Sequence, residues 1–361
     1  MDIIKIDKKF QLQNIDRENI EWHDATARSQ FLFGIYYDDS AKRYLRMPQD
    51  IADKVNEGVA NGCKRTAGGR LTFKTNSSFI AMKCVIDDEP MLYHMPLSGS
   101  HGFGLYRKGA YFGTMSPKIS DVKNAVDGEI AFQCLQDLYI DAVEEIELYF
   151  PLYNGVKKLY VGLEKGCTIE PASDYTYQKP VVFYGSSITQ GACASHPGND
   201  YQSHLSRWLH CDFINLGFSG AAQGEQEMSN YIATIDACVF VIDYDHNAPS
   251  VAYLEKTYYP FYKTIRSANL NTPILFMSKP DFDRGGSIAR RTVIHNAYKR
   301  AKKEGDKLVW FVDGKNAFGE LDRSACTVDT VHPNDLGFYR IAKNIYPTLK
   351  KALEYTNKEN E

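Results

Sequence analysis

The second half of the chain, after Pro180, alternates short apolar runs with longer stretches of helical character. The runs are almost entirely apolar, which is typical of strands buried on both faces of a parallel sheet. The predicted strands are Val181–Tyr184, Phe213–Leu216, Cys238–Ile242, Ile274–Met277 and Leu308–Val312. The predicted helices lie near 199–209, 224–235, 250–268, 287–304 and 335–355. This alternation predicts an α/β fold with a doubly wound, five-stranded parallel sheet.

The first half of the chain has a different pattern, in which short apolar runs are separated by Gly, Asn, Asp and Pro. Runs at this spacing predict a β-sandwich or a jelly roll. One helix is expected over Pro48–Ala60, where apolar positions recur on one face. We therefore predict two domains, a β-rich accessory domain at 1–175 and an α/β domain at 176–361. The clearest predicted strands of the first half are Arg70–Lys74, Phe79–Ile86, Ile130–Cys134 and Ile146–Phe150.

Composition and charge exclude several classes of partner. The hydrophobic fraction of 43% and the charged fraction of 24% are those of an ordinary globular protein. The net charge of −3 provides no basic surface for a nucleic acid, so none is expected as a partner. No apolar run reaches the length of about 18 residues that a membrane-spanning helix needs, so we expect no membrane partner.

The eight cysteines are spread singly along the chain, and none forms a Cys-x-x-Cys pair. A zinc knuckle or a redox dithiol is therefore not expected. The first residues contain no apolar core of a signal peptide, which favours a cytoplasmic protein with free thiols. Histidines such as His196, His204 and His295 have no metal-ligand spacing, so we expect no metal and no cofactor.

Small and polar residues follow the predicted parallel strands, at the edge of the sheet where sites form in folds of this class. The first strand leads into the serine pair Ser186-Ser187, and glycine-rich or acidic turns follow later strands. Lys279, Asp281, Asp283 and Arg284 come after the fourth strand and are interpreted as a solvated loop. The blocks of interest are Gly185-Ser186-Ser187-Ile188, Asn215–Gly220, Asp243–Asn247 and Asp329-x-x-His332-Pro333.

These four blocks, in this order, resemble the SGNH (GDSL-type) hydrolases, and the resemblance covers about residues 180–355. The family usually has Gly-Asp-Ser where this chain has Gly185-Ser186-Ser187. The segment Gly185–Gly191, Gly-Ser-Ser-Ile-Thr-Gln-Gly, is similar to one branch of the family. The N-terminal half, with His101-Gly102-Phe103-Gly104-Leu105-Tyr106, looks like the β-rich accessory domain of that branch. The resemblance implies a flavodoxin-like hydrolase fold for the second half.

The blocks contain the residues that acyl transfer requires. Ser187 is the candidate nucleophile, and His332 is the candidate base, since a neutral imidazole can take the hydroxyl proton. Asp329 is expected to accept a hydrogen bond from the other imidazole nitrogen and so fix its tautomer. Pro333 suits the first position of a helix, which predicts that Asp329 and His332 lie where a loop enters the last helix.

An oxyanion hole is expected from three donors: the backbone N–H groups of Ser187 and Gly220 and the side-chain amide of Asn247. Gly217 is the competing glycine, and Gly220 is preferred because the family's pattern implies it. Ser186, Thr189 and Gln190 are expected to hold the nucleophile turn by hydrogen bonds. The alternative for Asn247 is a plain turn residue.

The function expected from these residues is that of a serine ester hydrolase with an acyl-enzyme intermediate. The family habit and the accessory domain favour an O-acetyl esterase acting on acetylated sugars or oligosaccharides. Two alternatives stay open at this point: an acyltransferase with the same triad, and an inactive carbohydrate-binding or scaffold protein. The expected partner is a small-molecule or oligosaccharide ester, and a homo-oligomer is compatible with the sequence. We also expect the β-rich domain, through the region around 95–106, to pack near the carboxyl ends of the parallel strands or to reach a partner subunit's site, and so to narrow the pocket.

Overall fold

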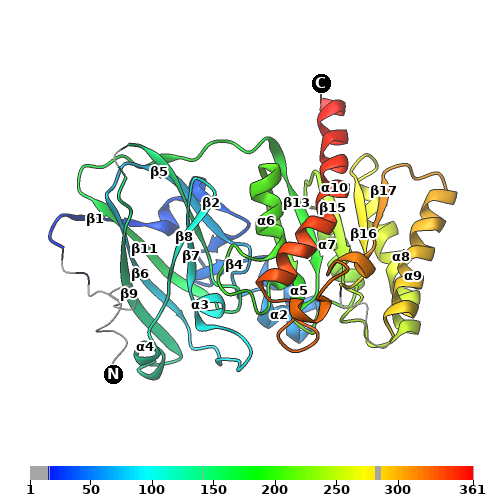
Figure 1. Ribbon diagram of the computed structural model, residues 1–361, viewed down its shortest axis with the longest axis horizontal. Coiled ribbons are helices and arrows are strands. Elements are labelled where there is room, and N and C mark those ends of the chain that lie inside the picture. The colour runs from blue at the N-terminus through cyan, green and yellow to red at the C-terminus, as the bar shows by residue number, and fades with distance from the viewer. Residues whose placement is uncertain (1–14, 16, 141, 281–285, 361) are drawn as a thin grey trace.

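The computed structural model describes residues 15, 17–140, 142–280 and 286–360. Figure 1 shows a β-rich N-terminal half beside a half in which helices cover both faces of a sheet. Within the described part of the chain, no helix has the length and apolar character needed to cross a bilayer.

A five-stranded parallel sheet forms the centre of the second half, in the order β14-β13-β15-β16-β17. Along each strand, successive side chains point to opposite faces. In β13, Val182 and Tyr184 enter one core while Val181 and Phe183 enter the other. The strands are β13 (Tyr177–Gly185), β14 (Cys211–Gly217), β15 (Val239–Asp243), β16 (Ile274–Met277) and β17 (Val309–Val312). The predicted α/β fold with a five-stranded parallel sheet is therefore confirmed.

Helices cover both faces of this sheet. Helices α7, α8 and α9 contribute to one core, and α5, α6 and α10 contribute to the other. The helices are α5 (Ser187–Gln190), α6 (Tyr201–Leu209), α7 (Gln226–Ala233), α8 (Val251–Ala268), α9 (Ser287–Lys303) and α10 (Asp335–Asn360). Two short 3₁₀ helices, η5 (Gly314–Asn316) and η6 (Arg323–Cys326), precede α10. Each face of the sheet is thus buried, which explains why the strands read as continuous apolar runs.

The N-terminal half contains a β-sandwich of two antiparallel sheets around a separate core. One sheet has the order β1-β11-β6-β9, and the other has the order β12-β5-β10-β7-β8 with β2 paired to β5. The strands of the first sheet are β1 (Ile20–Asp24), β6 (Phe79–Asp87), β9 (Glu129–Asp137) and β11 (Val156–Glu164). Those of the second are β2 (Leu32–Phe33), β5 (Arg70–Thr75), β7 (Phe103–Arg107), β8 (Ala110–Met115), β10 (Glu144–Tyr149) and β12 (Glu170–Pro171). The smaller elements are η3 (Ala25–Ala27), η4 (Ser29–Phe31), β3 (Tyr36–Asp38), β4 (Arg43–Leu45), α3 (Leu97–Ser100) and α4 (Ile119–Lys123).

The predicted single helix over Pro48–Ala60 is two helices, α1 (Gln49–Val55) and α2 (Glu57–Gly62). The chain breaks at Asn56, which has extended backbone angles and whose Oδ1 accepts the N–H of Val59. Its Nδ2 donates to the carbonyl of Ala221 at 3.0 Å. The prediction was wrong because Asn56 caps a new helix and contacts a distant loop, neither of which the apolar periodicity encodes.

The N-terminal half also contributes to the core of the parallel sheet. Ala52 of α1 and Val59 of α2 are fully buried in the same core as α7. The guanidinium of buried Arg46 donates to the carbonyls of Asn215 and Gly217 at 3.1 and 2.7 Å. The two halves are therefore joined by an apolar core and by hydrogen bonds to the end of β14.

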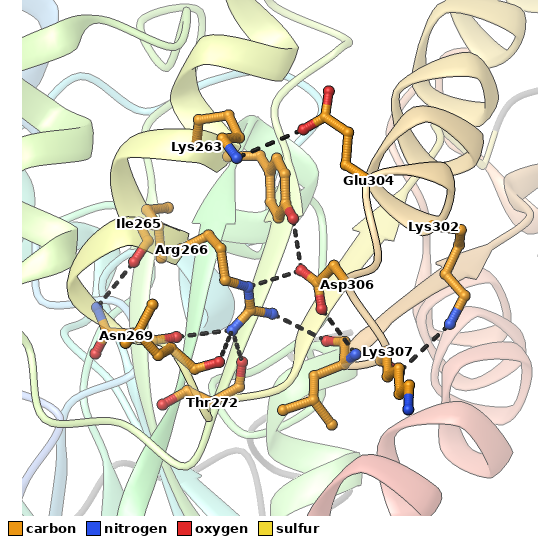
Figure 2. Close-up of polar contacts among 12 residues, drawn as sticks. Lys263, Ile265, Arg266, Asn269, Thr272, Lys302, Glu304, Asp306 and Lys307 are labelled. Atoms are coloured by element: carbon orange, nitrogen blue, oxygen red, sulfur yellow. Dashed lines mark hydrogen bonds and ion pairs between the residues drawn. The ribbon is translucent and has the colours of Figure 1, made fainter.

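A buried arginine at the end of α8 connects this helix to two neighbouring loops of the α/β half (Figure 2). Arg266, near the end of α8, donates its Nε to Asp306 Oδ2 at 2.7 Å. Its Nη1 donates to the carbonyls of Asn269 and Thr272, each at 2.7 Å, and its Nη2 to that of Leu308 at 3.1 Å. Arg266 thus ties the end of α8 to the loops that enter β16 and β17.

Candidate active site

The serine pair lies where β13 turns into the short helix α5. Ser186 is the N-cap, and its Oγ accepts the N–H of Ile188 at 3.2 Å. Ser187 is the first helical residue and is 9% exposed. An N–H group at this position has no partner within its helix, so the amide of Ser187 is available to a ligand. Gly191 ends the helix with φ at 102°, a left-handed conformation that glycine adopts without strain.

Three predicted residues from distant parts of the chain lie in series. Ser187 Oγ is 2.9 Å from Nε2 of His332. His332 Nδ1 is 2.7 Å from Oδ2 of Asp329. Both distances are normal for hydrogen bonds. The structure therefore brings a hydroxyl, an imidazole and a carboxylate together as the sequence predicted.

Asp329 is held by the same turn that carries the histidine. Its Oδ1 accepts the backbone N–H groups of Val331 and His332 at 3.0 and 2.7 Å. Partial burial raises the pKa of Asp329, but hydrogen bonds from the His332 ring and the two backbone amides outweigh it and lower the pKa to about 2. The carboxyl group is therefore ionised at neutral pH.

The expected place of Pro333 needs a correction. Helix α10 begins at Asp335, and Asn334 acts as its cap, since Asn334 Oδ1 accepts the N–H of Gly337 at 3.1 Å. Pro333 instead pairs with Thr327 in an isolated β-bridge. The pair Asp329 and His332 still lies in the loop that enters the last helix, but the helix begins two residues after Pro333.

The glycine loop after β14 lies beside the nucleophile turn. The N–H of Gly217 donates to Asn215 Oδ1 at 2.8 Å, so it is already used. Gly220 is exposed, has φ at 70°, and a Cβ placed on it would meet nothing within 4 Å. Asn247 Nδ2 donates one hydrogen bond, 2.9 Å long, to the carbonyl of Phe218. This leaves one N–H of the Asn247 amide for another acceptor.

Polar side chains of α5 itself hold the nucleophile turn and the glycine loop together. Gln190 Oε1 accepts the N–H of Ser219 at 3.0 Å, and its Nε2 donates to the carbonyl of Leu152 at 3.1 Å. Thr189 Oγ1 donates to Asp243 Oδ2 at 3.0 Å. Burial, with a smaller effect from the charge of Asp245, raises the pKa of Asp243 well above its ordinary value. The turn-holding roles expected of Ser186, Thr189 and Gln190 agree with these contacts.

Tyr153 was not singled out by the sequence. Its hydroxyl lies 3.4 Å from the carbonyl of Ser187, and burial raises its pKa. It comes from the segment that follows β10, so the N-terminal half supports the backbone of the nucleophile directly. No local motif marks this residue, because its role depends on packing between the two halves.

Two further residues near His332 were also missed. The ring of His94 lies 5.6 Å from the ring of His332, centroid to centroid. The thiol of Cys193, the imidazole of His94 and that of His332 offer atoms that all lie within 4.8 Å of one another. Burial, with help from the negative charge of Asp329, raises the pKa of Cys193 to about 12. In the region around 95–106, Ser98 Oγ donates to the carbonyl of Ser195 at 2.6 Å, so this region contacts the segment between α5 and α6.

The loop after the fourth strand differs from its interpretation. Lys279 is 7% exposed, and its N–H donates to Asp245 Oδ2 at 3.2 Å, so it is not part of a solvated loop. It was misassigned because a charged residue after a strand is usually exposed. Asp281, Asp283 and Arg284 lie outside the described residues.

Comparisons with known families match both halves of the chain. Residues 178–350 match the GDSL-like lipase/acylhydrolase family. Residues 20–169 match the N-terminal region of SGNH-hydrolase-type esterases, known as GxDLY. None of the curated proteins compared with the chain is similar enough in sequence to count as a match.

Several solved structures share the fold over nearly the whole chain. A protein from Bacteroides ovatus ATCC 8483 described as a GDSL-like lipase has 28% identity and a TM-score of 0.81, covering 93% of this chain and 98% of its own. The salicylyl-acyltransferase SsfX3 from a tetracycline biosynthetic pathway has 19% identity and a TM-score of 0.74, covering 93% of this chain and 98% of its own.

A family two carbohydrate esterase from Clostridium thermocellum, solved in complex with cellohexaose, has 14% identity and a TM-score of 0.59. It covers 81% of this chain and 94% of its own. At this identity the likeness shows the fold alone. Residues 178–350 thus belong to the GDSL-like lipase/acylhydrolase family, and residues 20–169 form the GxDLY-type N-terminal region of SGNH-hydrolase-type esterases.

Proposed function

We propose that the protein is a serine ester hydrolase, an O-acetyl esterase of sugars or oligosaccharides, with Ser187, His332 and Asp329 as its catalytic triad. The observation that carries the proposal is the continuous series of hydrogen bonds from Ser187 Oγ through His332 to Asp329, at 2.9 and 2.7 Å. A serine hydroxyl is inert until a base takes its proton, and this series supplies an oriented base.

The first half of the reaction forms an acyl-enzyme. Ser187 Oγ attacks the ester carbonyl carbon while its proton passes to His332 Nε2. Asp329 keeps the other proton on Nδ1 and stabilises the imidazolium that forms. The imidazolium then gives the proton to the alcohol oxygen, the bond between that oxygen and the acyl carbon breaks, and the alcohol leaves.

The negative charge on the carbonyl oxygen in the transition state needs preorganised donors. The N–H groups of Ser187 and Gly220 and the free N–H of the Asn247 amide are the donors in this proposal. In the second half of the reaction a water molecule, deprotonated by His332, attacks the acyl-enzyme and releases acetate and Ser187. If an alcohol replaces water in this step, the same residues perform acyl transfer.

Aromatic residues beside the triad support a sugar ester as substrate. Tyr93 is 93% exposed, its ring lies 4.7 Å from that of His94, and His94 lies 5.6 Å from His332. An exposed aromatic face leading to the base offers a surface on which a sugar ring can lie. Tyr93→Ala is therefore expected to lower kcat/KM for an acetylated oligosaccharide more than for an aryl acetate.

The decisive experiment compares the wild type with Ser187→Ala on an aryl acetate. We expect Ser187→Ala to lose about 10⁴-fold or more in kcat, because the nucleophile is gone. Ser186→Ala is the matched variant, which loses a helix cap but keeps the nucleophile. An organophosphonate should modify the wild type and Ser186→Ala at Ser187 and leave Ser187→Ala unmodified. Adding alcohols in the same assay measures acyl transfer against hydrolysis. Activity that survives in Ser187→Ala contradicts the proposal.

A further inference from the structure

A cluster of nitrogen and sulfur donors lies at the junction of the two halves. His94 comes from the segment between β6 and α3, Cys193 follows α5, and His332 belongs to the loop before α10. One donor atom from each lies within 4.8 Å of the others. Donors around a tetrahedral zinc ion are about 3.3–3.7 Å apart, as its bond lengths require. The three donor atoms would therefore have to move together by about 1 Å to reach the donor spacing of a zinc site.

The imidazole of His332 is already oriented as a metal ligand is. Its Nδ1 is fixed by Asp329 Oδ2 at 2.7 Å, so the lone pair lies on Nε2, where Ser187 Oγ lies 2.9 Å away and where a metal ion would compete with it. Histidine ligands of metals usually donate their other ring N–H to a carboxylate, a backbone carbonyl or a water, which fixes the tautomer and makes the ring more basic, and Asp329 is such a partner. Catalysis and metal binding therefore require the same orientation of His332.

The other two donors are packed beside His332 but take no part in the triad: Cys193 belongs to the buried core that contains α5, and the His94 ring lies against those of Tyr93 and His332. His94 Nδ1 is buried and has no hydrogen-bond partner among the described residues. An unsatisfied buried nitrogen is costly, so it points to a group that the site receives. Cys193 is a free, buried cysteine with φ at 71°, a conformation that is uncommon for any residue except glycine.

We propose that His94, Cys193 and His332 bind a zinc-like divalent ion that reversibly inhibits the enzyme. The site offers two imidazoles and one thiol. These donors suit zinc, whereas magnesium and calcium prefer oxygen ligands. On binding, the thiol gives its proton to the solvent, and the metal takes the lone pair of His332 Nε2. Ser187 then has no base. The inhibition rests on the proposed function, whereas the binding does not.

The first test measures binding without any assay of activity. Co²⁺ is titrated into the metal-free protein, and absorption is followed for the thiolate-to-cobalt charge-transfer band; calorimetry with Zn²⁺ gives the stoichiometry. The wild type should bind one ion and show the band. Cys193→Ala should lose the band, and His94→Ala should weaken Zn²⁺ binding by about tenfold or more. Cys84→Ala and His295→Ala, which remove a buried thiol and a histidine elsewhere, should bind as the wild type does.

The second test measures inhibition of ester hydrolysis by Zn²⁺. The activity of each variant with Zn²⁺ is compared with the activity of the same variant in the presence of a chelator. Zn²⁺ should inhibit the wild type, the chelator should restore its activity, and His94→Ala should need about tenfold more Zn²⁺ for the same inhibition. A cobalt band in a wild type that hydrolyses no ester would support the site and contradict the proposed function. The site itself is refuted if the wild type gives no band, if Mg²⁺ binds as well as Zn²⁺, or if His94→Ala binds Zn²⁺ unchanged. His94 lies in a loop segment, so its variant keeps the test valid should Cys193→Ala fail to fold.

Discussion

At the scale of single residues, Asp329 shows how one side chain does two tasks. One carboxylate oxygen accepts the imidazole Nδ1–H of His332, and the other accepts two backbone N–H groups of the turn that carries the ring. The contacts that orient the base therefore also shape the loop. They are also the contacts that lower the pKa of Asp329 to about 2 against the effect of burial.

The lowered pKa of Asp329 predicts how stability depends on pH. The folded state favours the ionised carboxylate, so its contribution to the free energy of unfolding is present above the ordinary value of 3.8 and is lost as pH falls toward 2. Urea unfolding of the wild type and Asp329→Ala between pH 5 and pH 3 checks this. Their difference in unfolding free energy should shrink as the pH falls through this range. A difference that grows on acidification would contradict the assignment.

Asn247 permits a conservative test of the oxyanion hole. Asn247→Asp keeps the size of the side chain but replaces the N–H donors with acceptors and a negative charge. Because this charge opposes the one that develops on the substrate, kcat should fall by about 10²–10³-fold with a smaller change in KM. Steady-state kinetics on an aryl acetate measures this. If Asn247→Asp and Asn247→Ala both keep wild-type kcat, Asn247 is a plain turn residue, which is the alternative interpretation of the sequence.

At the scale of elements, the apolar pattern predicted the strands well and their ends less well. Strand β13 begins at Tyr177, before the predicted Val181, because exposed Gln178 and Lys179 extend it beyond the buried part of the sheet. The break between α1 and α2 was missed because Asn56 acts through a cap and a distant carbonyl. Local sequence encodes burial and turns, but it does not encode which distant segment a side chain meets.

The same limit applies to the candidate site. The residues that follow the parallel strands could be named from the sequence, because the fold brings the ends of those strands to one edge. His94, Cys193 and Tyr153 could not be named. His94 and Tyr153 reach the site through contact between the two halves, and Cys193 reaches it through the turn that follows α5; no spacing in the chain records these contacts.

Arg266 offers a prediction about how the α/β half is fastened. Arg266→Met keeps most of the side-chain volume but leaves Asp306 and several carbonyls without their donor. Removing one partner of a buried pair should lower the free energy of unfolding by about 3–5 kcal/mol. Arg300→Met is the control, since Arg300 is 63% exposed and pairs with Glu304 on the surface, where the loss should be about 1 kcal/mol or less. Equal losses in urea unfolding would contradict the role assigned to Arg266.

At the scale of the whole molecule, the two halves are interlocked rather than simply adjacent. Helices α1 and α2 complete one core of the parallel sheet, and Leu152 belongs to the other. Fully buried Arg70 of β5 pairs with Asp212 of β14. The predicted division of the chain into domains at 1–175 and 176–361 therefore stays a prediction, because these contacts join residues on the two sides of the boundary.

A fragment of residues 176–361 tests this interlocking. Without the first half, Asp212 loses the cation that offsets its burial, and the carbonyls of Asn215 and Gly217 lose the Arg46 guanidinium. The apolar surface of the α/β half that packs against α1 and α2 becomes exposed to solvent, which favours aggregation. We expect the fragment to be largely insoluble, or to lack the near-ultraviolet circular dichroism of a packed core. If 176–361 instead unfolds cooperatively at the temperature of the full chain and hydrolyses an aryl acetate at the same rate, the parallel sheet holds its site without the N-terminal half.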